Sequence, residues 1–168
     1  MSDNVRTIEN ARTRAICGEL VTLSLACLAP YASVKLQGAR GNSLALEIAG
    51  YEFPETSRDS LQWLVIRLDA EVGGRRWTCE DPFLQTEDVD RLATWLELAA
   101  EGFAKHSIAF LEPELELDAS PEADGLIRLR AWLEFAARPP WAKAESREHD
   151  FAIELLVTRP DLMAAAGA

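Results

Sequence analysis

Apolar residues recur at every second position over much of this chain, and at helical spacing over only one long stretch. The clearest alternation runs through 61–72, where Leu64, Ile66 and Leu68 are separated by residues of the opposite face. Period-2 alternation is typical of a strand with one buried face. A Gly-Gly pair follows at 73–74, and glycines adopt the positive φ angles of a tight hairpin turn without steric cost. The pattern therefore favours antiparallel β-structure.

The same alternation predicts six further strands. They are expected at 42–50, 75–80, 107–111, 114–118, 126–137 and 151–157. Within 126–137, Phe135 continues the apolar face, whereas Glu134 shares the opposite face with Arg128, Arg130 and Trp132. At Pro113 the apolar positions change from even to odd numbers, which indicates a bulge or bend at a sheet edge because proline has no N–H to donate. An exposed edge is therefore expected at 114–118.

One segment has the spacing of an amphipathic helix. Thr86 is the expected N-cap, apolar residues recur at i, i+3 and i+4 up to Ala100, and Gly102 stands at the position of a C-terminal cap. With no other long helix in the body of the chain, this helix near 86–101 must pack across a sheet. We therefore expect an α+β fold, mainly antiparallel β in a sandwich-like or strongly curved sheet, with one principal helix packed on it. The segment after Asp161 is expected to add a short helical turn at most.

The chain is expected to form one domain over 34–168, preceded by an extension over 1–33. The extension contains an apolar stretch from Ala15 to Ala29, which resembles a signal peptide but is interrupted by Glu19. It is too short and too polar to span a membrane. We expect it to pack on the domain as a helix or an early strand, in a cytoplasmic protein.

Negative charge is concentrated in one part of the sequence. Between Ser107 and Ile127 there is no Lys or Arg, but there are six carboxylates: Glu112, Glu114, Glu116, Asp118, Glu122 and Asp124. The middle ones alternate with Leu115 and Leu117, which predicts a strand with one apolar face and one negative face. Such a row is a candidate contact surface for a basic protein, although a solvated face that keeps the protein soluble has the same pattern.

The charge balance also disfavours some partners. The net charge is −11, and residues 51–168 carry 12 basic and 24 acidic side chains. Phosphate groups attract Lys and Arg, so nucleic acid and anionic membrane surfaces are unfavourable partners. A basic protein is the favoured partner. The charged strand 114–118 resists pairing with a copy of itself, so a monomer or a weak homodimer is expected.

No catalytic, metal or cofactor motif is present. Cys17, Cys27 and Cys79 have no metal-binding spacing, and His106 and His149 have no Ser or Cys motif to serve. We therefore expect a protein that is not an enzyme and that needs no cofactor. Trp132, which shares its strand face with arginines, and Trp141, in a Pro-rich loop, are added to the six carboxylates as candidate contact residues for a partner.

Three stretches carry distinctive short motifs. They are Gln-Trp-Leu-Val-Ile at 62–66, the helix at 86–102 with its Leu-Ala-Thr-Trp-Leu core, and Phe-Leu-Glu-Pro-Glu-Leu at 110–115, followed by a strand led by Gly125. In this order they resemble the WapI-type bacterial immunity proteins. The resemblance covers about 40–158. It implies a non-catalytic protein that binds and blocks the toxin domain of a contact-dependent competition system. Such toxins often attack nucleic acid and present basic surfaces, for which an acidic strand is a crude phosphate mimic.

The favoured function is therefore an immunity-like protein that blocks a toxin domain through an acidic surface. The alternative is a small-ligand-binding β domain. In that case Trp63, Trp77 and Trp132 would line a pocket between two sheets.

Overall fold

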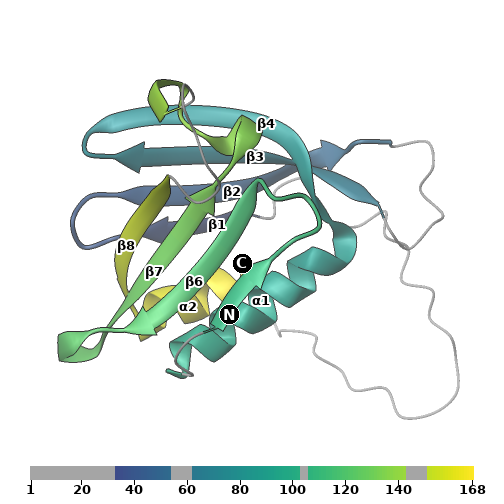
Figure 1. Ribbon diagram of the computed structural model, residues 1–168. Helices are drawn as coiled ribbons and strands as arrows, with labels where there is room; N and C mark the ends of the chain where they lie inside the picture. The colour runs from purple at the N-terminus through teal and green to yellow at the C-terminus, as the bar shows by residue number, and fades with distance from the viewer. Residues whose placement is uncertain (1–32, 54–61, 103–105, 143–150) are drawn as a thin grey trace, which may run out of the picture.

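The described residues form two antiparallel four-stranded sheets, one behind the other, with two helices below them (Figure 1). The computed structural model describes residues 33–53, 62–102, 106–142 and 151–168. Sheet A contains, in spatial order, β1 (Ser33–Gln37), β2 (Ser43–Tyr51), β3 (Trp63–Val72) and β4 (Arg75–Gln85). Sheet B contains β5 (His106–Ala109), β6 (Leu115–Pro121), β7 (Leu126–Leu133) and β8 (Ala152–Thr158). The helices are α1 (Thr86–Ala100) and α2 (Arg159–Ala166), and the expected α+β class is confirmed.

The core lies between the two sheets and is closed by the helices. Leu64, Ile66 and Leu68 of β3 are buried, as the alternation predicts, and so are Leu129 and Leu133 of β7. Burial of apolar surface on this scale is the main favourable contribution to folding. Each strand therefore has an inner face that packs in the core and an outer face available for contacts.

The sheets are tied together along two seams. At one, the N–H of Ala39, in the β1–β2 turn, donates to the carbonyl of Leu156 in β8 at 2.9 Å. At the other, the indole N–H of Trp77 in β4 donates to the buried carbonyl of Ala137 at 3.0 Å. Both bonds join residues far apart in the sequence, and the second satisfies the buried carbonyl of Ala137.

The β3–β4 hairpin turns at Gly73 and Gly74, whose φ angles are 58° and 79°. Two positive φ angles in succession are the requirement of the tight hairpin turn expected at this position. Strand β4 is longer than predicted, because it continues past Glu80 to Gln85. Pro82 is accommodated where the register shifts, on a strand at the edge of the sheet.

Helix α1 begins one residue earlier than a Thr86 cap implies. Gln85 is the N-cap, and its backbone N–H donates to the Asp88 carboxylate at 2.8 Å. The predicted N-cap was therefore wrong, because Asp88 supplies the reciprocal bond of a capping box three residues into the helix. The expected C-terminal cap is present, with Gly102 at a φ of 78°.

A second helix corrects the expectation of a short helical turn at the C-terminal end. Helix α2 starts after Thr158, whose hydroxyl accepts from the Asp161 N–H, while the Asp161 carboxylate accepts from the Thr158 N–H at 2.8 Å. Leu162 is fully buried, and α2 packs against α1. Helix α1 therefore has a helical neighbour, which its apolar stripe alone did not indicate.

The region around Pro113 also differs from expectation. Strands β5 and β6 pair with each other, with Ile108 opposite Leu117, so the change in apolar parity marks a hairpin connection and not a bulge. Strand β6 then pairs with β7 on its other side. The predicted exposed edge at 114–118 was therefore wrong, because β5 covers it.

The predicted strand at 126–137 stops at Leu133. A 3₁₀ turn over Phe135–Ala137 follows, in which Phe135 has a φ of 44° and is 65% exposed, although its parity placed it in the core. Glu134, expected on the outer face, is buried and accepts from the Nε of Arg138 at 2.9 Å. The reversal follows from the turn, because period 2 no longer holds once the strand ends.

The expected N-terminal extension lies outside the described residues, except for Ser33 at the start of β1. Cys17, Cys27 and His149 also lie outside them, while Cys79 is half-buried in β4. Neither of the helices described is long and apolar enough to cross a membrane.

Candidate protein-binding face

The six predicted carboxylates do not form one continuous row. Glu116 and Asp118 lie on the outer face of β6, half-buried. Two others, Glu112 and Glu114, precede β6 at one end of sheet B. The remaining two, Glu122 and Asp124, follow β6 in the connection to β7 at the opposite end.

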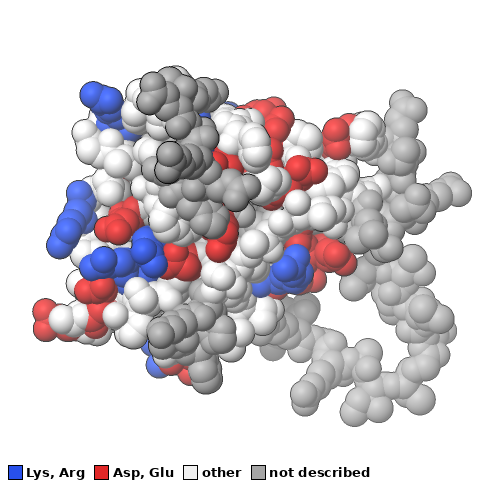
Figure 2. All heavy atoms as spheres, in the orientation of Figure 1, with Lys and Arg blue, Asp and Glu red and all other residues white. Residues whose placement is uncertain are grey.

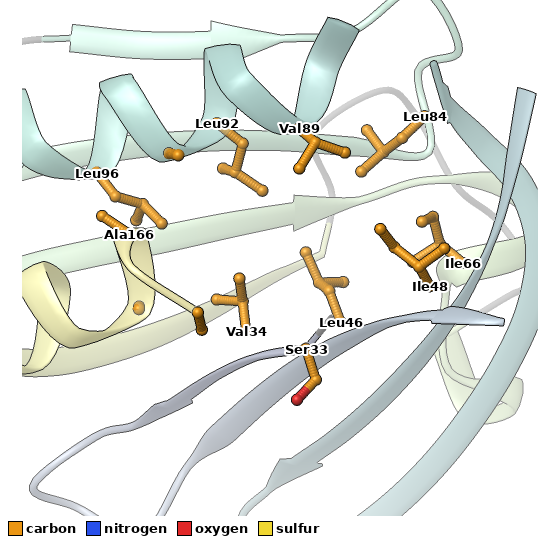
Figure 3. Close-up of a pocket in the computed structure, with 13 residues that line it drawn as sticks. Ser33, Val34, Leu46, Ile48, Ile66, Leu84, Val89, Leu92, Leu96 and Ala166 are labelled. Carbon is orange, nitrogen blue, oxygen red and sulfur yellow. The ribbon is translucent and has the colours of Figure 1, made fainter. Parts of the chain in front are cut away.

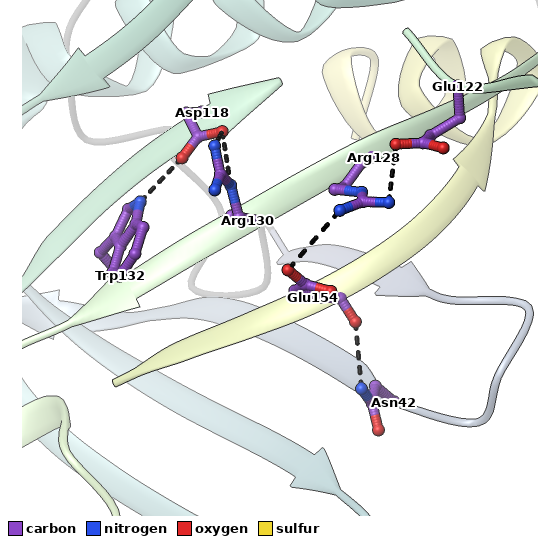
Figure 4. A network of polar contacts seen from close by, with 7 residues as sticks. All are labelled: Asn42, Asp118, Glu122, Arg128, Arg130, Trp132 and Glu154. Carbon is purple, nitrogen blue, oxygen red and sulfur yellow. Dashed lines mark hydrogen bonds and ion pairs between the residues drawn. The ribbon is translucent and has the colours of Figure 1, made fainter. Parts of the chain in front are cut away.

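Asp118 is bound on both of its carboxylate oxygens (Figure 4). Oδ1 accepts from Nε of Arg130 at 2.9 Å and lies 2.9 Å from Nη2 of the same guanidinium. Oδ2 accepts from the indole N–H of Trp132 at 2.7 Å. The guanidinium carbon of Arg130 also lies 5.6 Å from the centre of the Trp132 ring, within cation–π range. One carboxylate therefore fixes an arginine and a tryptophan on the surface of the central strand β7.

A second group of contacts surrounds Arg128. Its guanidinium lies 2.8 Å from the Glu122 carboxylate and 4.0 Å from that of Glu154 in β8. The side-chain amide of Asn42, in the β1–β2 turn, donates to the backbone carbonyl of Glu154 at 3.0 Å. Figure 4 shows these contacts side by side with the Asp118 group. These contacts connect the outer surface of sheet B to the β1–β2 turn of sheet A.

These residues form a face that we call the polar face of sheet B. It is defined by Glu116, Asp118, Glu122, Arg128, Arg130, Trp132 and Glu154. In Figure 2, blue and red side chains are intermixed over this part of the surface. The face is mixed in charge, with more carboxylates than guanidiniums, and its ion pairs are partly exposed, with 38% of the Arg130 side chain accessible.

The alternation in sequence puts Arg128 and Arg130 on the same strand face as Trp132, but it does not show that they lie opposite the acidic strand. The pairing of Asp118 with Arg130, and of Glu116 with Trp132, depends on the register between β6 and β7. The signal in the sequence for this pairing was the complementary charge pattern of the two strands, because opposite charges at facing positions stabilise a sheet.

Glu114 differs from the other carboxylates because it is partly buried and no described residue donates a hydrogen bond to its Oε2. Burial raises the pKa of the Glu114 carboxyl, and the negative charges of Glu112 and Asp81 raise it further, against a backbone hydrogen bond that lowers it. Glu114 also anchors the backbone, since its carbonyl accepts from the N–H of Glu134 at 3.0 Å. Asp81, in β4 of sheet A, is therefore near enough to this acidic end of sheet B to act on Glu114 electrostatically.

Trp141 belongs to a different cluster. It lies in the 3₁₀ turn Pro140–Ala142, 42% exposed, and its ring packs edge-to-face on Trp77 with the ring centres 5.3 Å apart. The guanidinium carbon of Arg75 lies 5.6 Å from its ring centre. Phe151 completes the cluster at 5.7 Å from Trp77. The structure therefore brings Trp132 together with the acidic strand but places Trp141 beside β4.

The pocket expected in the ligand-binding alternative is not formed by the three tryptophans. Trp63 and Trp132 lie on the outer faces of their strands, and Trp77 is buried in the aromatic cluster. The described residues do form a mostly apolar cavity of about 190 Å³, but it lies between sheet A, α1 and the end of α2, and its lining is aliphatic except for Ser33. Within the described ranges, no cluster of three or more His, Cys, Asp or Glu side chains is arranged to hold a metal ion.

Comparison with known proteins gives one family. The model of the immunity protein WapI-like family matches residues 35–168, which is most of the chain. No curated protein and no solved structure matches the chain. The match includes both helices, all of sheet B with its polar face, and all of sheet A except Ser33 and Val34.

Proposed function

Because this chain belongs to the immunity protein WapI-like family, we propose that it is a non-catalytic protein that binds and blocks a toxin domain. The contact surface is the polar face of sheet B. The acidic end, Glu112 and Glu114, and Asp124 at the opposite end extend this surface, and Trp141 contributes from the neighbouring cluster. The partner is a basic protein domain, and the protein acts by covering a surface of the toxin.

The observation that carries this proposal is the fixed arrangement of Asp118, Arg130 and Trp132. Tryptophan and arginine are the residues that most often dominate binding energy at protein interfaces. A side chain that is already held in place loses less conformational entropy when a partner binds. Asp118 holds both side chains on the solvent side of β7, so they are presented with little remaining cost of ordering.

The charge distribution supports a basic partner. The net charge of −11 attracts a cationic domain at long range, although Asp118 and Glu122 are already paired with arginines of the chain itself. The electrostatic field of this net charge therefore acts mainly on the association rate, while contacts on the polar face set the dissociation rate. Association should slow as salt is raised, because screening acts over about 10 Å at 0.1 M.

The proposal is tested by co-expressing the full chain with the product of the gene immediately upstream, followed by affinity capture. The double variant Glu116→Lys/Asp118→Lys reverses the charge of the outer face of β6, and capture should fall at least about tenfold. The matched control is Asp69→Lys on the outer face of β3, where Asp69 is likewise paired with an arginine, Arg67, at 3.3 Å.

The control should retain the complex, since sheet A is not part of the proposed surface. A complex that survives the β6 variant and is lost with Asp69→Lys would place the contact on sheet A. Absence of any complex with the upstream product would contradict the immunity role and favour the ligand-binding alternative.

A further inference from the structure

A mostly apolar groove, with Ser33 among its lining residues, opens between sheet A, helix α1 and the end of α2 (Figure 3). Its floor is made by buried side chains such as Leu46 and Leu92, and its rim by half-buried ones such as Val34, Ile48 and Val89. In Figure 3 the side chains of the strands and those of α1 point toward one another across the groove. Its volume is about 190 Å³. Apolar cavities of roughly 150 Å³ hold a molecule such as benzene, so this groove has room for apolar side chains.

The first described residues, Ser33 and Val34, themselves line the groove. The 32 residues before them therefore join the domain at the rim of the groove. At about 3.3–3.6 Å per residue, Leu25 can lie no further than roughly 28 Å from Ser33. Any apolar side chain in this part of the sequence is consequently tethered close to an apolar surface, at an effective concentration of about a millimolar.

The sequence next to the tether matches the groove in chemistry. From Leu20 to Val34 there is no charged residue, although 27% of the chain is charged. Val21, Leu23 and Leu25 alternate with Thr22 and Ser24, so the segment has distinct apolar and polar positions. It also precedes the part of the chain that matches the family. By contrast, the 54–61 segment carries Glu55, Arg58 and Asp59, which suit the groove poorly.

We propose that the groove between sheet A and α1 is the docking site of this chain's own segment 20–28. The segment covers the groove with apolar side chains from Val21, Leu23 and Leu25, and it leaves Thr22 and Ser24 toward water. Covering a patch of this kind removes apolar surface from solvent and protects the protein from non-specific association. The docking is independent of the polar face of sheet B.

The first test measures exposure of the groove in the full chain with the apolar dye 1-anilinonaphthalene-8-sulfonate. The variant Leu23→Asp/Leu25→Asp should undock the segment and increase dye fluorescence at least about threefold. The control Thr22→Asp/Ser24→Asp adds the same charge at polar positions and should leave the fluorescence unchanged. Equal, strong dye binding by the unmodified chain and by both variants would show an open groove and overturn the proposal.

The second test is disulfide trapping in a Cys17→Ser/Cys79→Ser background, where Cys27 is the remaining thiol. Ala93→Cys places a partner thiol in the groove, and Thr94→Cys places one on the exposed surface of the same helix. Mild oxidation should link Cys27 within one chain to position 93 at least about tenfold faster than to position 94. Equal rates at both positions would overturn the proposal, and so would disulfide-linked dimers, which indicate a second copy in the groove.

Discussion

At the scale of single residues, Glu114 has the least favourable environment among the acidic candidates. Its carboxyl is partly buried, faces Glu112 and Asp81, and receives no hydrogen bond at Oε2 from any residue that the structure describes. Its pKa is therefore raised above the ordinary value of 4.5. Between the ordinary pKa and the raised one, the folded state binds more protons than the unfolded state. Ionisation of Glu114 therefore lowers stability as the pH rises through that window.

Replacing the Glu114 carboxyl by an amide removes the loss of stability that ionisation causes. We predict that Glu114→Gln is more stable than the unmodified chain at pH 7, and that the difference disappears as the pH falls below 4.5. Urea unfolding at several pH values measures it. Asp161→Asn is the control of opposite sign, because the hydroxyl and N–H of Thr158 lower the pKa of Asp161. The Asp161→Asn protein should be less stable than the unmodified chain at pH 7, and this difference should shrink as the pH falls through the lowered pKa of Asp161. A Glu114→Gln protein less stable than the unmodified chain at pH 7 would contradict the account.

Much of the residue-level structure follows from the alternation in sequence. The inner positions of β3 and β7 are buried as parity predicts, because successive side chains of a strand point to opposite faces. The rule fails at Glu134 and Phe135, where the strand ends and a 3₁₀ turn begins. Nothing in the local sequence marks that end, since the apolar positions continue through Phe135. The pairing with Arg138 that buries Glu134 depends on the turn itself.

At the scale of elements, the β3–β4 hairpin depends on the glycine conformations. Gly74 has a φ of 79° and open space where a Cβ would lie, so Gly74→Ala introduces backbone strain but no clash. We predict a loss of about 1–2 kcal/mol in the free energy of unfolding, the usual cost of a left-handed conformation for a residue with a Cβ. Thermal and urea unfolding measure this loss.

Gly50 in β2 provides the matched control. It also has open space around the Cβ position, but its φ lies outside the left-handed region. Gly50→Ala should therefore be neutral or stabilise by up to about 1 kcal/mol, through reduced entropy of the unfolded chain. Equal losses for the two variants would show that the turn conformation is not the cause.

Helix α2 is predicted to be an integral part of the fold. The side chain of Leu162, on the inner side of the helix, is fully buried, whereas that of the next residue, Met163, is 41% exposed. Leu162→Ala should cost about 2–5 kcal/mol, because it removes buried apolar surface and leaves a cavity. Met163→Ala should cost less than about 1 kcal/mol. Equal effects in urea unfolding would contradict the packing of α2 against α1.

The elements were predictable to different degrees. Seven of the eight described strands and α1 follow from the period of the apolar residues, whereas β1 was not predicted and α2, with 8 residues, was expected as a turn at most. A signal for α2 was nevertheless present, since Thr158 and Asp161 have the spacing of a capping box and Pro160 stands in the first turn. The β5–β6 hairpin was not predictable from parity alone, because a bulge and a turn shift the apolar positions in the same way.

At the scale of the whole molecule, the charge surplus and the local charge pattern have different roles. The sequence indicated an acidic body and an acidic strand, and the outer face of β6 carries Glu116 and Asp118, while Glu114 precedes the strand. It did not indicate that Asp118 and Glu122 are paired with Arg130 and Arg128, because that depends on how β6 and β7 are aligned. The candidate surface is consequently a mixed-charge face with a fixed aromatic side chain, on a molecule that is acidic overall.

The dissociation constant of the purified complex shows whether the polar face of sheet B is the contact surface for a toxin domain. The key variant is Trp132→Ala. The matched control is Trp63→Ala, which removes a half-buried tryptophan from the outer face of sheet A. Urea unfolding is the control that checks whether both variants remain folded.

We predict that Trp132→Ala raises the dissociation constant at least about 30-fold, the effect of losing a residue that contributes about 2 kcal/mol or more. Trp63→Ala should change it by less than about threefold. An unchanged dissociation constant for the Trp132→Ala protein, with the complex weakened by Trp63→Ala instead, would contradict the claim and move the contact surface to sheet A.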